Sequence, residues 1–301
     1  MTPADRRVRA FVDRPVTDLD AARLVAERAA DHWRLDAPRL VRAGMNATFA
    51  AGEVIVRVSA PSAEPTVALD LAAFWTNRGL TVPVPARVDV VRVGDLSATA
   101  WRRLHPSGER VDWTTVGRMV RAVHDTAQTS LPPAVPLPSP VDLPWWDFAA
   151  LLDSVRTDLD PPARAAIEAT IERHAAWGRF SAAVVCHGDV HPGNVIMTSD
   201  GPVLLDWDLL CVAPPGWDHA PMMTMASRWG GPAGDYEAFA DGYGRSMRGD
   251  PEAEAFAELR LVAATLMRLA AGRRDPDAMA EAEIRLRYWR GEPDAPTWTP
   301  Q

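Results

Sequence analysis

The 301-residue chain contains no lysine, and all 32 of its basic residues are arginine. It has only two cysteines, Cys186 and Cys211, which excludes a disulfide framework as the source of its stability. No run of eighteen apolar residues occurs, so the sequence predicts no membrane-spanning helix. A formal net charge of −8 argues against a nucleic acid substrate and is compatible with a cationic small molecule.

The chain nevertheless has enough apolar residues for a folded protein. With 47% apolar composition it can bury one large core or two moderate ones. Its polar, Arg-rich stretch over residues 1–14 lacks the apolar region of a secretory signal, so we expect a cytoplasmic protein. We further expect a monomer or homodimer that engages neither membrane nor nucleic acid.

A polar motif runs from His187 to Asn194, and Asp206 follows it after an apolar stretch. Asp189 supplies a carboxylate that can orient and deprotonate a hydroxyl. Asn194 and Asp206 supply the hard oxygen donors that Mg²⁺ prefers in proteins. This order of groups is typical of a phosphoryl-transfer site, with Asp189 as the base and Asn194 and Asp206 as metal ligands.

The spacing of these residues has a structural reason. Val184-Val185 reads as a short buried strand that leads into the polar loop. Residues 195–197 and 202–205 read as a hairpin joined by a Gly-containing turn. Asn194 and Asp206 are therefore expected at neighbouring strand ends.

The segment His187 to Asn194, with Asp206-Trp207-Asp208 after it, resembles the catalytic loop and magnesium-binding motif of the aminoglycoside phosphotransferases and related small-molecule kinases. These enzymes share the protein-kinase-like fold. The resemblance implies an α+β, two-lobed architecture with a small antiparallel-sheet N-terminal lobe and a larger, mainly helical C-terminal lobe. It also implies Asp189 as catalytic base and Asn194 and Asp206 on Mg²⁺.

Hydrophobic periodicity places the lobes along the chain. Short alternating runs before residue 103 read as strands, and i, i+3, i+4 patterns after it read as helices. We predict a nucleotide-binding lobe at residues 1–100, a hinge at 101–105, and a helical lobe at 106–301 that contains the catalytic loop and the acceptor site. Strands are expected near 40–42, 47–50, 54–58, 87–93 and 96–102, and helices near 66–78, 116–123, 145–156, 161–177, 221–228, 235–245, 252–271 and 277–290.

The absence of lysine bears on nucleotide binding. Many relatives grip the phosphates with a strand lysine, so here Arg57 is expected in that role, and its planar fork can hold two phosphate oxygens. The resemblance also places a turn containing Gly44 and Asn46 over the phosphates, and Arg103 and Leu104 at the hinge beside the base.

The partner of Arg57 stays open. Relatives usually begin the next helix with a Glu that pairs with the strand cation. Here the nearest acids are Glu64 and Asp70, and neither lies clearly in register.

Three further residues are expected to support the site. His187 is predicted to hold the loop through a backbone hydrogen bond. Asp218 is predicted to open a helix as its N-cap and to bond back to the catalytic loop. Asp208 either faces the acceptor or makes an internal pair.

These residues together predict an ATP- and Mg²⁺-dependent kinase, with GTP as the other nucleotide, that transfers the γ-phosphate to a hydroxyl of a small molecule. The acceptor is expected to be cationic or a sugar, such as an aminoglycoside, an amino sugar or another antibiotic or metabolite. Acids and aromatics in the helical lobe, most of which read as solvated faces and buried rings, are candidates for its pocket, among them Trp146, Tyr236, Glu237 and Glu254.

Two other functions compete with this prediction. A pseudokinase-type module would use the same fold to bind a nucleotide or a partner without turnover. A metallophosphoesterase would use Asp189 and His191 in a two-metal centre. That second class also needs an upstream Asp-x-His and an Asn-His pair, which the seven histidines of this chain do not provide.

Overall fold

The computed structural model describes residues 14–180 and 182–299. Contacts between residues divide the chain into two compact units. The first, here called the sheet unit, comprises residues 1–112, 127–137 and 194–210; the second, the helical unit, comprises residues 113–126, 138–193 and 211–301. Residues 1–13 of the predicted first lobe, and with them most of the N-terminal stretch taken to lack a signal, lie outside the described residues.

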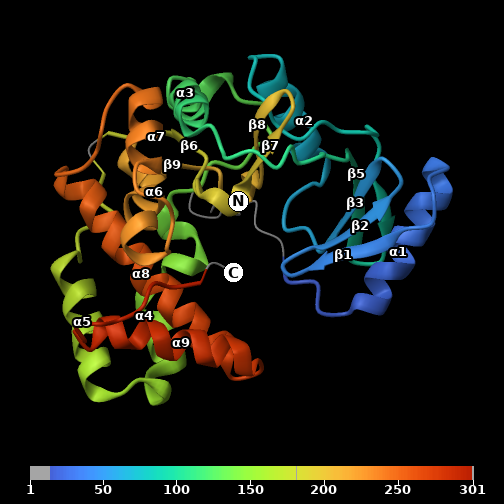
Figure 1. The fold of residues 1–301 in the computed structure, drawn as a ribbon. Coiled ribbons are helices and arrows are strands. Elements are labelled where there is room, and N and C mark those ends of the chain that lie inside the picture. Colours follow the sequence, from blue (N-terminus) through green and yellow to red (C-terminus); the bar gives the residue numbers. More distant parts are fainter. Residues whose placement is uncertain (1–13, 181, 300–301) are drawn as a thin grey trace, which may run out of the picture. The chain divides into compact units, whose positions relative to one another are not determined.

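The sheet unit is built on five strands: β1 (Arg39–Ala43), β2 (Ala47–Ala51), β3 (Val54–Ser59), β4 (Val91–Val93) and β5 (Leu96–Arg102). Their order in the sheet is β1-β2-β3-β5-β4, and every neighbouring pair is antiparallel (Figure 1). The predicted antiparallel sheet is therefore confirmed.

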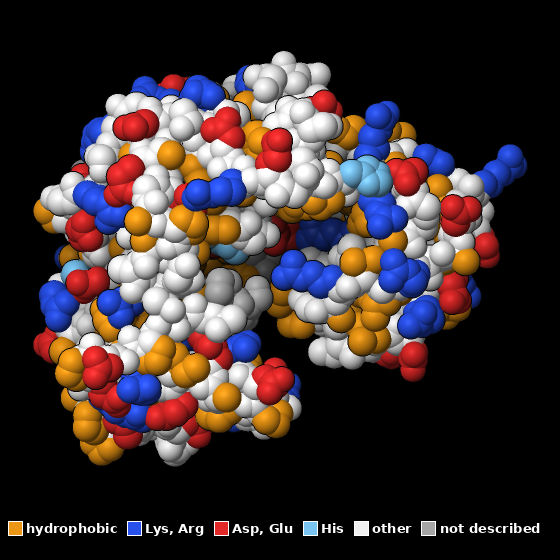
Figure 2. All heavy atoms as spheres, viewed as in Figure 1, with side chains coloured by type: hydrophobic (Ala, Val, Ile, Leu, Met, Phe, Trp, Pro, Cys, Tyr) orange, Lys and Arg blue, Asp and Glu red, His pale blue; other side chains and the backbone are white. Residues whose placement is uncertain are grey.

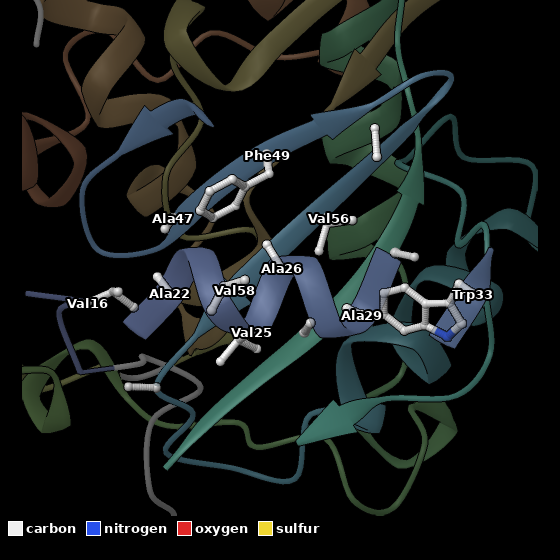
Figure 3. Close-up of a cluster of buried hydrophobic side chains, with 14 residues drawn as sticks. Val16, Ala22, Val25, Ala26, Ala29, Trp33, Ala47, Phe49, Val56 and Val58 are labelled. Atoms are coloured by element: carbon white, nitrogen blue, oxygen red, sulfur yellow. The ribbon is translucent and has the colours of Figure 1, made fainter. Parts of the chain in front are cut away.

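One face of this sheet is apolar. Phe49, Val56 and Ala100 lie opposite one another on β2, β3 and β5, and residues paired in this way point to the same face. Helix α1 (Leu19–Trp33) packs over that face (Figure 3). Helix α1 was not predicted from the sequence, although its buried residues recur at helical spacing along one face.

The opposite face of the sheet carries a polar row. The strand register aligns Arg42 with Thr48, Thr48 with Arg57, and Arg57 with Thr99. Because paired residues share a face, all four side chains leave the sheet on the side away from α1. The sheet thus presents Arg57 on the face opposite to the one that packs against α1.

Strand β4 is shorter than predicted. The expected strand over 87–93 pairs with β5 only from Val91 to Val93. The residues before it bind the end of α1 instead: Arg87 donates to the Trp33 carbonyl, and Asp89 accepts hydrogen bonds from the Trp33 indole and from His32. Side-chain bonds to a helix end therefore replaced ladder pairing over this stretch.

A hairpin of β7 (Val195–Thr198) and β8 (Gly201–Leu204) belongs to the sheet unit. Backbone bonds attach it there: Leu204 N–H donates to the Thr81 carbonyl, and Ser107 N–H to the Met197 carbonyl. The predicted division put this hairpin in the helical lobe, at residues 106–301. The compact units of the structure instead group it with the N-terminal sheet.

The helical unit agrees with the predicted helices within a few residues at most ends. It contains seven α-helices among the described residues: α3 (Trp113–His124), α4 (Phe148–Val155), α5 (Pro161–Arg173), α6 (Gly216–Arg228), α7 (Asp235–Tyr243), α8 (Pro251–Gly272) and α9 (Pro276–Trp289) (Figure 1). A short antiparallel pair, β6 (Val184–Cys186) and β9 (Cys211–Ala213), lies in the same unit. The predicted helix over 66–78 is α2 (Thr66–Thr76) of the sheet unit.

Helices α3 and α7 approach closely at two glycines. A Cβ on Gly117 would lie 2.0 Å from the Phe239 carbonyl oxygen, and one on Gly242 would lie 1.9 Å from the Thr114 carbonyl oxygen. Any larger residue would push the two helices apart. This approach brings His124, at the end of α3, beside Tyr243 at the end of α7.

The surface carries the charged residues of both signs that the composition contains. On the face shown in Figure 2, acidic and basic side chains are interspersed over the helical unit. Within the described residues, no helix is long and apolar enough to cross a membrane.

Candidate active site

Asp218 anchors the loop of residues 187–193, which is the predicted catalytic loop. This residue lies in the first turn of α6 and is fully buried. One carboxylate oxygen accepts from the Gly188 N–H at 2.7 Å, and the other accepts from the His187 N–H at 2.8 Å. The expectation that Asp218 is the N-cap was wrong, because the helix begins two residues earlier and Pro215 occupies the cap position.

A buried chain of polar groups supports Asp218 from behind. His124 Nε2 lies 3.0 Å from Asp218 Oδ2, and His124 Nδ1 lies 2.9 Å from the Tyr243 hydroxyl. Burial raises the pKa of Tyr243 to about 12, so the hydroxyl keeps its proton and can donate to His124. Burial also acts to raise the pKa of Asp218, but its bonds to His124 and to the loop outweigh that effect and lower it.

Asp189 is held by two histidines of its own loop. The buried His187 accepts the Asp189 backbone N–H at its Nδ1, 3.2 Å away. His191 Nδ1 accepts the Gly193 N–H at 3.1 Å, so a neutral His191 carries its proton on Nε2, which lies 3.3 Å from Asp189 Oδ2. Gly188 turns the backbone here with a φ of 94°, a conformation that favours glycine.

Arg260 is a member of this site that sequence reasoning missed. It comes from the middle of α8, which also carries Arg268, and no local pattern distinguishes one arginine from the other. Its guanidinium lies 3.4 Å from Asp189 Oδ1. Partial burial acts to raise the pKa of Asp189, but the bond from His191 and the charges of His191, Arg260 and His187 together lower it, so the carboxylate is ionised at neutral pH.

In the sheet unit, Asn194 and Asp206 lie at the same end of the β7–β8 hairpin. The Leu205 N–H donates to the Asn194 carbonyl at 2.8 Å, which extends the ladder by one step beyond the strands. Asp206 follows directly with a φ of 57°, one of two non-glycine residues with positive φ in the described part of the chain. Such a backbone is strained, and strained residues concentrate at functional sites.

This donor set fits Mg²⁺. A buried amide side chain and an exposed carboxylate at adjacent strand ends provide one or two oxygen ligands, which is the number that Mg²⁺ usually takes from protein. Asn194 and Asp206 are accordingly the residues that would hold the ion.

Arg57 forms an ion pair with Asp208. Asn46 also donates a side-chain hydrogen bond to Asp208. The carboxylate of Asp208, which follows the β7–β8 hairpin, therefore binds Arg57 from the polar row of the sheet and Asn46 from the predicted phosphate turn. Burial raises the pKa of Asp208; the charge of Arg57 opposes this rise and that of Asp206 adds to it. Of the two roles left open for Asp208, the structure shows the internal pair.

Neither acid considered as the partner of Arg57 pairs with it. Glu64 forms an ion pair with Arg92 instead, although it lines the same small pocket as Arg57 and Asp208. Asp70 is exposed on α2. The partner comes from a segment about 150 residues away in sequence, which no local pattern could indicate.

The remaining predicted nucleotide contacts lie near the strand ends. The Gly44 N–H donates to the Asn46 carbonyl at 3.1 Å and closes the predicted turn. Arg103 N–H donates to the Glu53 carbonyl, and its guanidinium lies 3.3 Å from the Gly52 carbonyl. Contact of Arg103 and Leu104 with a base stays a prediction.

The chain matches the family model described as "Phosphotransferase enzyme family" over residues 39–259, well over half of its length. The chain belongs to this family. The match covers both the Arg57 strand and the predicted catalytic loop. It confirms the predicted class of enzyme, a phosphotransferase that acts on hydroxyl groups of small molecules.

Solved structures of low sequence identity share the fold of this family member. Amicoumacin kinase hAmiN, in complex with AMP-PNP, Ca²⁺ and Ami, is 14% identical with a TM-score of 0.65 over 93% of this chain and 97% of that one. AMP-bound spectinomycin phosphotransferase is 13% identical, with a TM-score of 0.59 over 87% and 90%. A choline/ethanolamine kinase family protein from Mesorhizobium loti is 16% identical, with a TM-score of 0.58 over 84% and 87%.

None of the curated proteins compared with the chain matches it significantly. The solved structures confirm the predicted protein-kinase-like, α+β fold.

Membership of the phosphotransferase family overturns the metallophosphoesterase alternative. The geometry agrees: in the described part of the chain, one group of His, Cys or carboxylate side chains is close enough to hold a metal, and it consists of His124, Cys186 and Asp218. Asp189 and His191 are not in it. Burial raises the pKa of Cys186 well above its usual value, and Asp218 is already committed to the loop, so this group is a hydrogen-bonded core.

Proposed function

We propose that this phosphotransferase moves the γ-phosphoryl group of ATP to a hydroxyl of a small molecule, with Mg²⁺ as its metal. One observation carries the proposal: Asp189 is a carboxylate whose position in the loop is set by contacts with three residues, His187, His191 and Arg260, and whose lowered pKa keeps it ionised. An ionised carboxylate can accept the proton of an acceptor hydroxyl and orient its oxygen.

In this proposal, one set of residues binds the nucleotide and its metal, and another activates the acceptor. Arg57, freed from or shared with Asp208, would hold nucleotide phosphates through its planar fork. Asn194 and Asp206 would hold Mg²⁺, which when bound neutralises charge on the β- and γ-phosphates. Asp189 would align the acceptor and take its proton. Positioning and electrostatic stabilisation supply most of the rate in such a mechanism.

The acceptor itself belongs to the proposal. An aminoglycoside, an amino sugar or another antibiotic or metabolite fits the family, and solved neighbours carry names that refer to spectinomycin, choline or ethanolamine, and amicoumacin. Two acids that are candidates for binding a cationic acceptor already have partners within this protein: Glu237 pairs with Arg248, and Glu254 accepts from the Gly249 N–H. Trp146 and Tyr236 are buried, so they serve packing.

The test is phosphoryl transfer measured across a panel of acceptors. Purified protein with radiolabelled ATP and Mg²⁺ would be assayed against aminoglycosides, spectinomycin, amino sugars, choline and homoserine, with GTP in parallel and EDTA as the metal control. We expect label transfer to at least one acceptor, abolished by EDTA. Nucleotide binding without transfer to any acceptor would favour the pseudokinase-type module. The cytoplasmic location, where ATP and Mg²⁺ are available, is part of the same proposal.

A further inference from the structure

Arg260 bonds to the catalytic loop from a neighbouring helix. Its Nη2 donates to the Gly188 carbonyl at 2.5 Å, and its Nη1 lies 3.4 Å from Asp189 Oδ1. Its side chain is only 10% exposed. Arg260 lies one residue past the part of the chain that matches the family model.

The guanidinium rests on two tryptophan rings. Its Cζ lies 4.8 Å from the Trp146 ring centroid and 4.5 Å from that of Trp217, distances at which a cation is attracted to an aromatic face. The two rings meet edge to face, with centroids 4.9 Å apart and planes at 80°. They form a rigid corner that limits the directions in which the guanidinium can point.

The nitrogen atoms of the Arg260 guanidinium differ in their hydrogen bonding. Its Nε is buried with no hydrogen-bond partner, while both terminal nitrogens reach the loop. Burying a charged group with an unpaired N–H is costly. The favourable contacts that offset this cost are the two rings and the two acceptors at Gly188 and Asp189, so the side chain is committed to the loop.

We propose that Arg260 is a positioning residue for phosphoryl transfer: held against Trp146 and Trp217, it fixes the Gly188 peptide and one carboxylate oxygen of Asp189. His191 contacts the other oxygen. Together they set the rotation of the carboxylate, and with it the direction from which an acceptor hydroxyl is held. The inference rests on the proposed function for its effect on rate.

The chain offers a matched control in Arg285. This residue lies in α9 of the same unit, its side chain is 1% exposed, and its Cζ lies 4.9 Å and 5.3 Å from the ring centroids of Trp229 and Trp298. It bonds to Glu281 and to the carbonyls of Ala264 and Thr299, away from the catalytic loop. Loss of a buried, ring-stacked arginine can therefore be compared at two places.

The first measurement is hydrogen exchange at the loop. Peptides covering residues 187–193 would be followed by mass spectrometry in the wild-type protein, Arg260→Met and Arg285→Met. We expect exchange at least tenfold faster in Arg260→Met and unchanged in Arg285→Met, because only the former frees the Gly188 carbonyl and Asp189. Loop exchange no faster in Arg260→Met than in Arg285→Met overturns the proposal.

The second measurement separates rate from binding. With the acceptor most active in the panel, we expect Arg260→Met to lower kcat by about 100-fold, the size of effect that a small misplacement of a reacting group produces. The KM for ATP should stay within twofold, since Arg57, Asn194 and Asp206 are untouched. Arg260→Lys, which keeps the charge but lacks the fork, should recover a small part of kcat.

Chemical rescue completes the test. Guanidinium chloride at non-denaturing concentration should raise the kcat of Arg260→Ala at least tenfold, whereas urea and NaCl should not. A loss of kcat that guanidinium leaves unchanged, with KM for ATP raised in parallel, would mean general damage and overturn the proposal. If the wild-type protein transfers phosphate to no acceptor, the proposed function fails, and loop exchange still decides the role of Arg260.

Discussion

The two charged clusters of this protein hold their ions differently. In the sheet unit, Arg57 and Asp208 face each other as a partly exposed pair, with side chains 24% and 16% exposed. In the helical unit, Asp218 is fully buried and accepts bonds from two backbone N–H groups and from His124. We therefore expect the first cluster to exchange partners when a ligand binds, and the second to stay as it is because its bonds hold the loop.

This difference indicates a division of tasks between the clusters. A group that must bind and release nucleotide benefits from a partner that it can leave, and an ion pair that is still partly open to water costs less to break than a fully buried one. A group that must hold a reacting carboxylate in place benefits from buried bonds, which are strong because each is costly to leave unmade. Substitutions in the two clusters should therefore affect different quantities.

The largest effect is expected at Asp189. Asp189→Asn keeps the shape of the side chain but removes the carboxylate that orients and deprotonates the acceptor. General base catalysis contributes about 10²- to 10⁴-fold, so kcat should fall by roughly 10³-fold. ATP binding, followed by thermal shift, should be unaltered. A variant that retained more than a tenth of the wild-type kcat would remove Asp189 from the reaction.

Asp218→Ala should cost stability. The substitution leaves the N–H groups of His187 and Gly188 and the His124 ring without their buried acceptor. Breaking a buried pair of this kind costs about 3–5 kcal/mol. Urea unfolding would measure the loss, with the exposed turn residue Asp200→Ala as control, expected within about 0.5 kcal/mol of wild type. Equal effects of the two substitutions would contradict the buried-scaffold description.

Acid should weaken the same buried hydrogen bonds of Asp218 and so lower the stability of the protein. The folded-state pKa of Asp218 is lowered, so its contribution is present above the unfolded-state pKa of about 3.9 and is lost as pH falls through the folded value. The free energy of unfolding should therefore decrease below about pH 4. Urea titrations at a series of pH values would show this slope, and Asp218→Asn should flatten it. An unchanged slope in that variant would assign acid sensitivity to other carboxylates.

A smaller effect is expected at Arg57. Removing a charged hydrogen-bond donor costs roughly 1.5–3 kcal/mol when its acceptor is a charged group, but part of this is offset because Asp208 no longer competes for the cation. Arg57→Ala should thus weaken ATP binding about tenfold, measured by calorimetry, without lowering the stability of the helical unit. Unchanged affinity would show that this arginine does not replace the lysine of other family members.

The smallest effect is expected at Asn46. This residue donates one neutral amide hydrogen bond to Asp208. The bond is made to Asp208, so we expect only about 0.5 kcal/mol of its worth to affect nucleotide binding, and Asn46→Ala should change ATP affinity by about two- to threefold. The same calorimetric titration measures it. An effect larger than that of Arg57→Ala would reverse the order within the sheet-unit cluster.

Local pattern identified most of the elements and the main motif. Alternating apolar residues identified the strands, and helical periodicity identified α3 to α9. The fixed spacing from His187 to Asp206 identified the catalytic class, since chemistry at one loop leaves its residues close together in sequence. Helix α1 was not predicted, although its buried residues recur at helical spacing. Strand β4 is shorter than predicted because side-chain bonds to α1 replace part of its ladder.

Tertiary structure decided which distant charges meet. Asp208 pairs with Arg57 across about 150 residues. Asp218 accepts from His187 and Gly188 although it is not the cap of its helix. Arg260 contacts Asp189 from a helix whose sequence gives no sign of this contact. Sequence determines the propensity and chemistry of each residue. The pairing of buried ions depends on which strands, loops and helices pack closely enough to exclude water. This packing is a property of the folded chain alone.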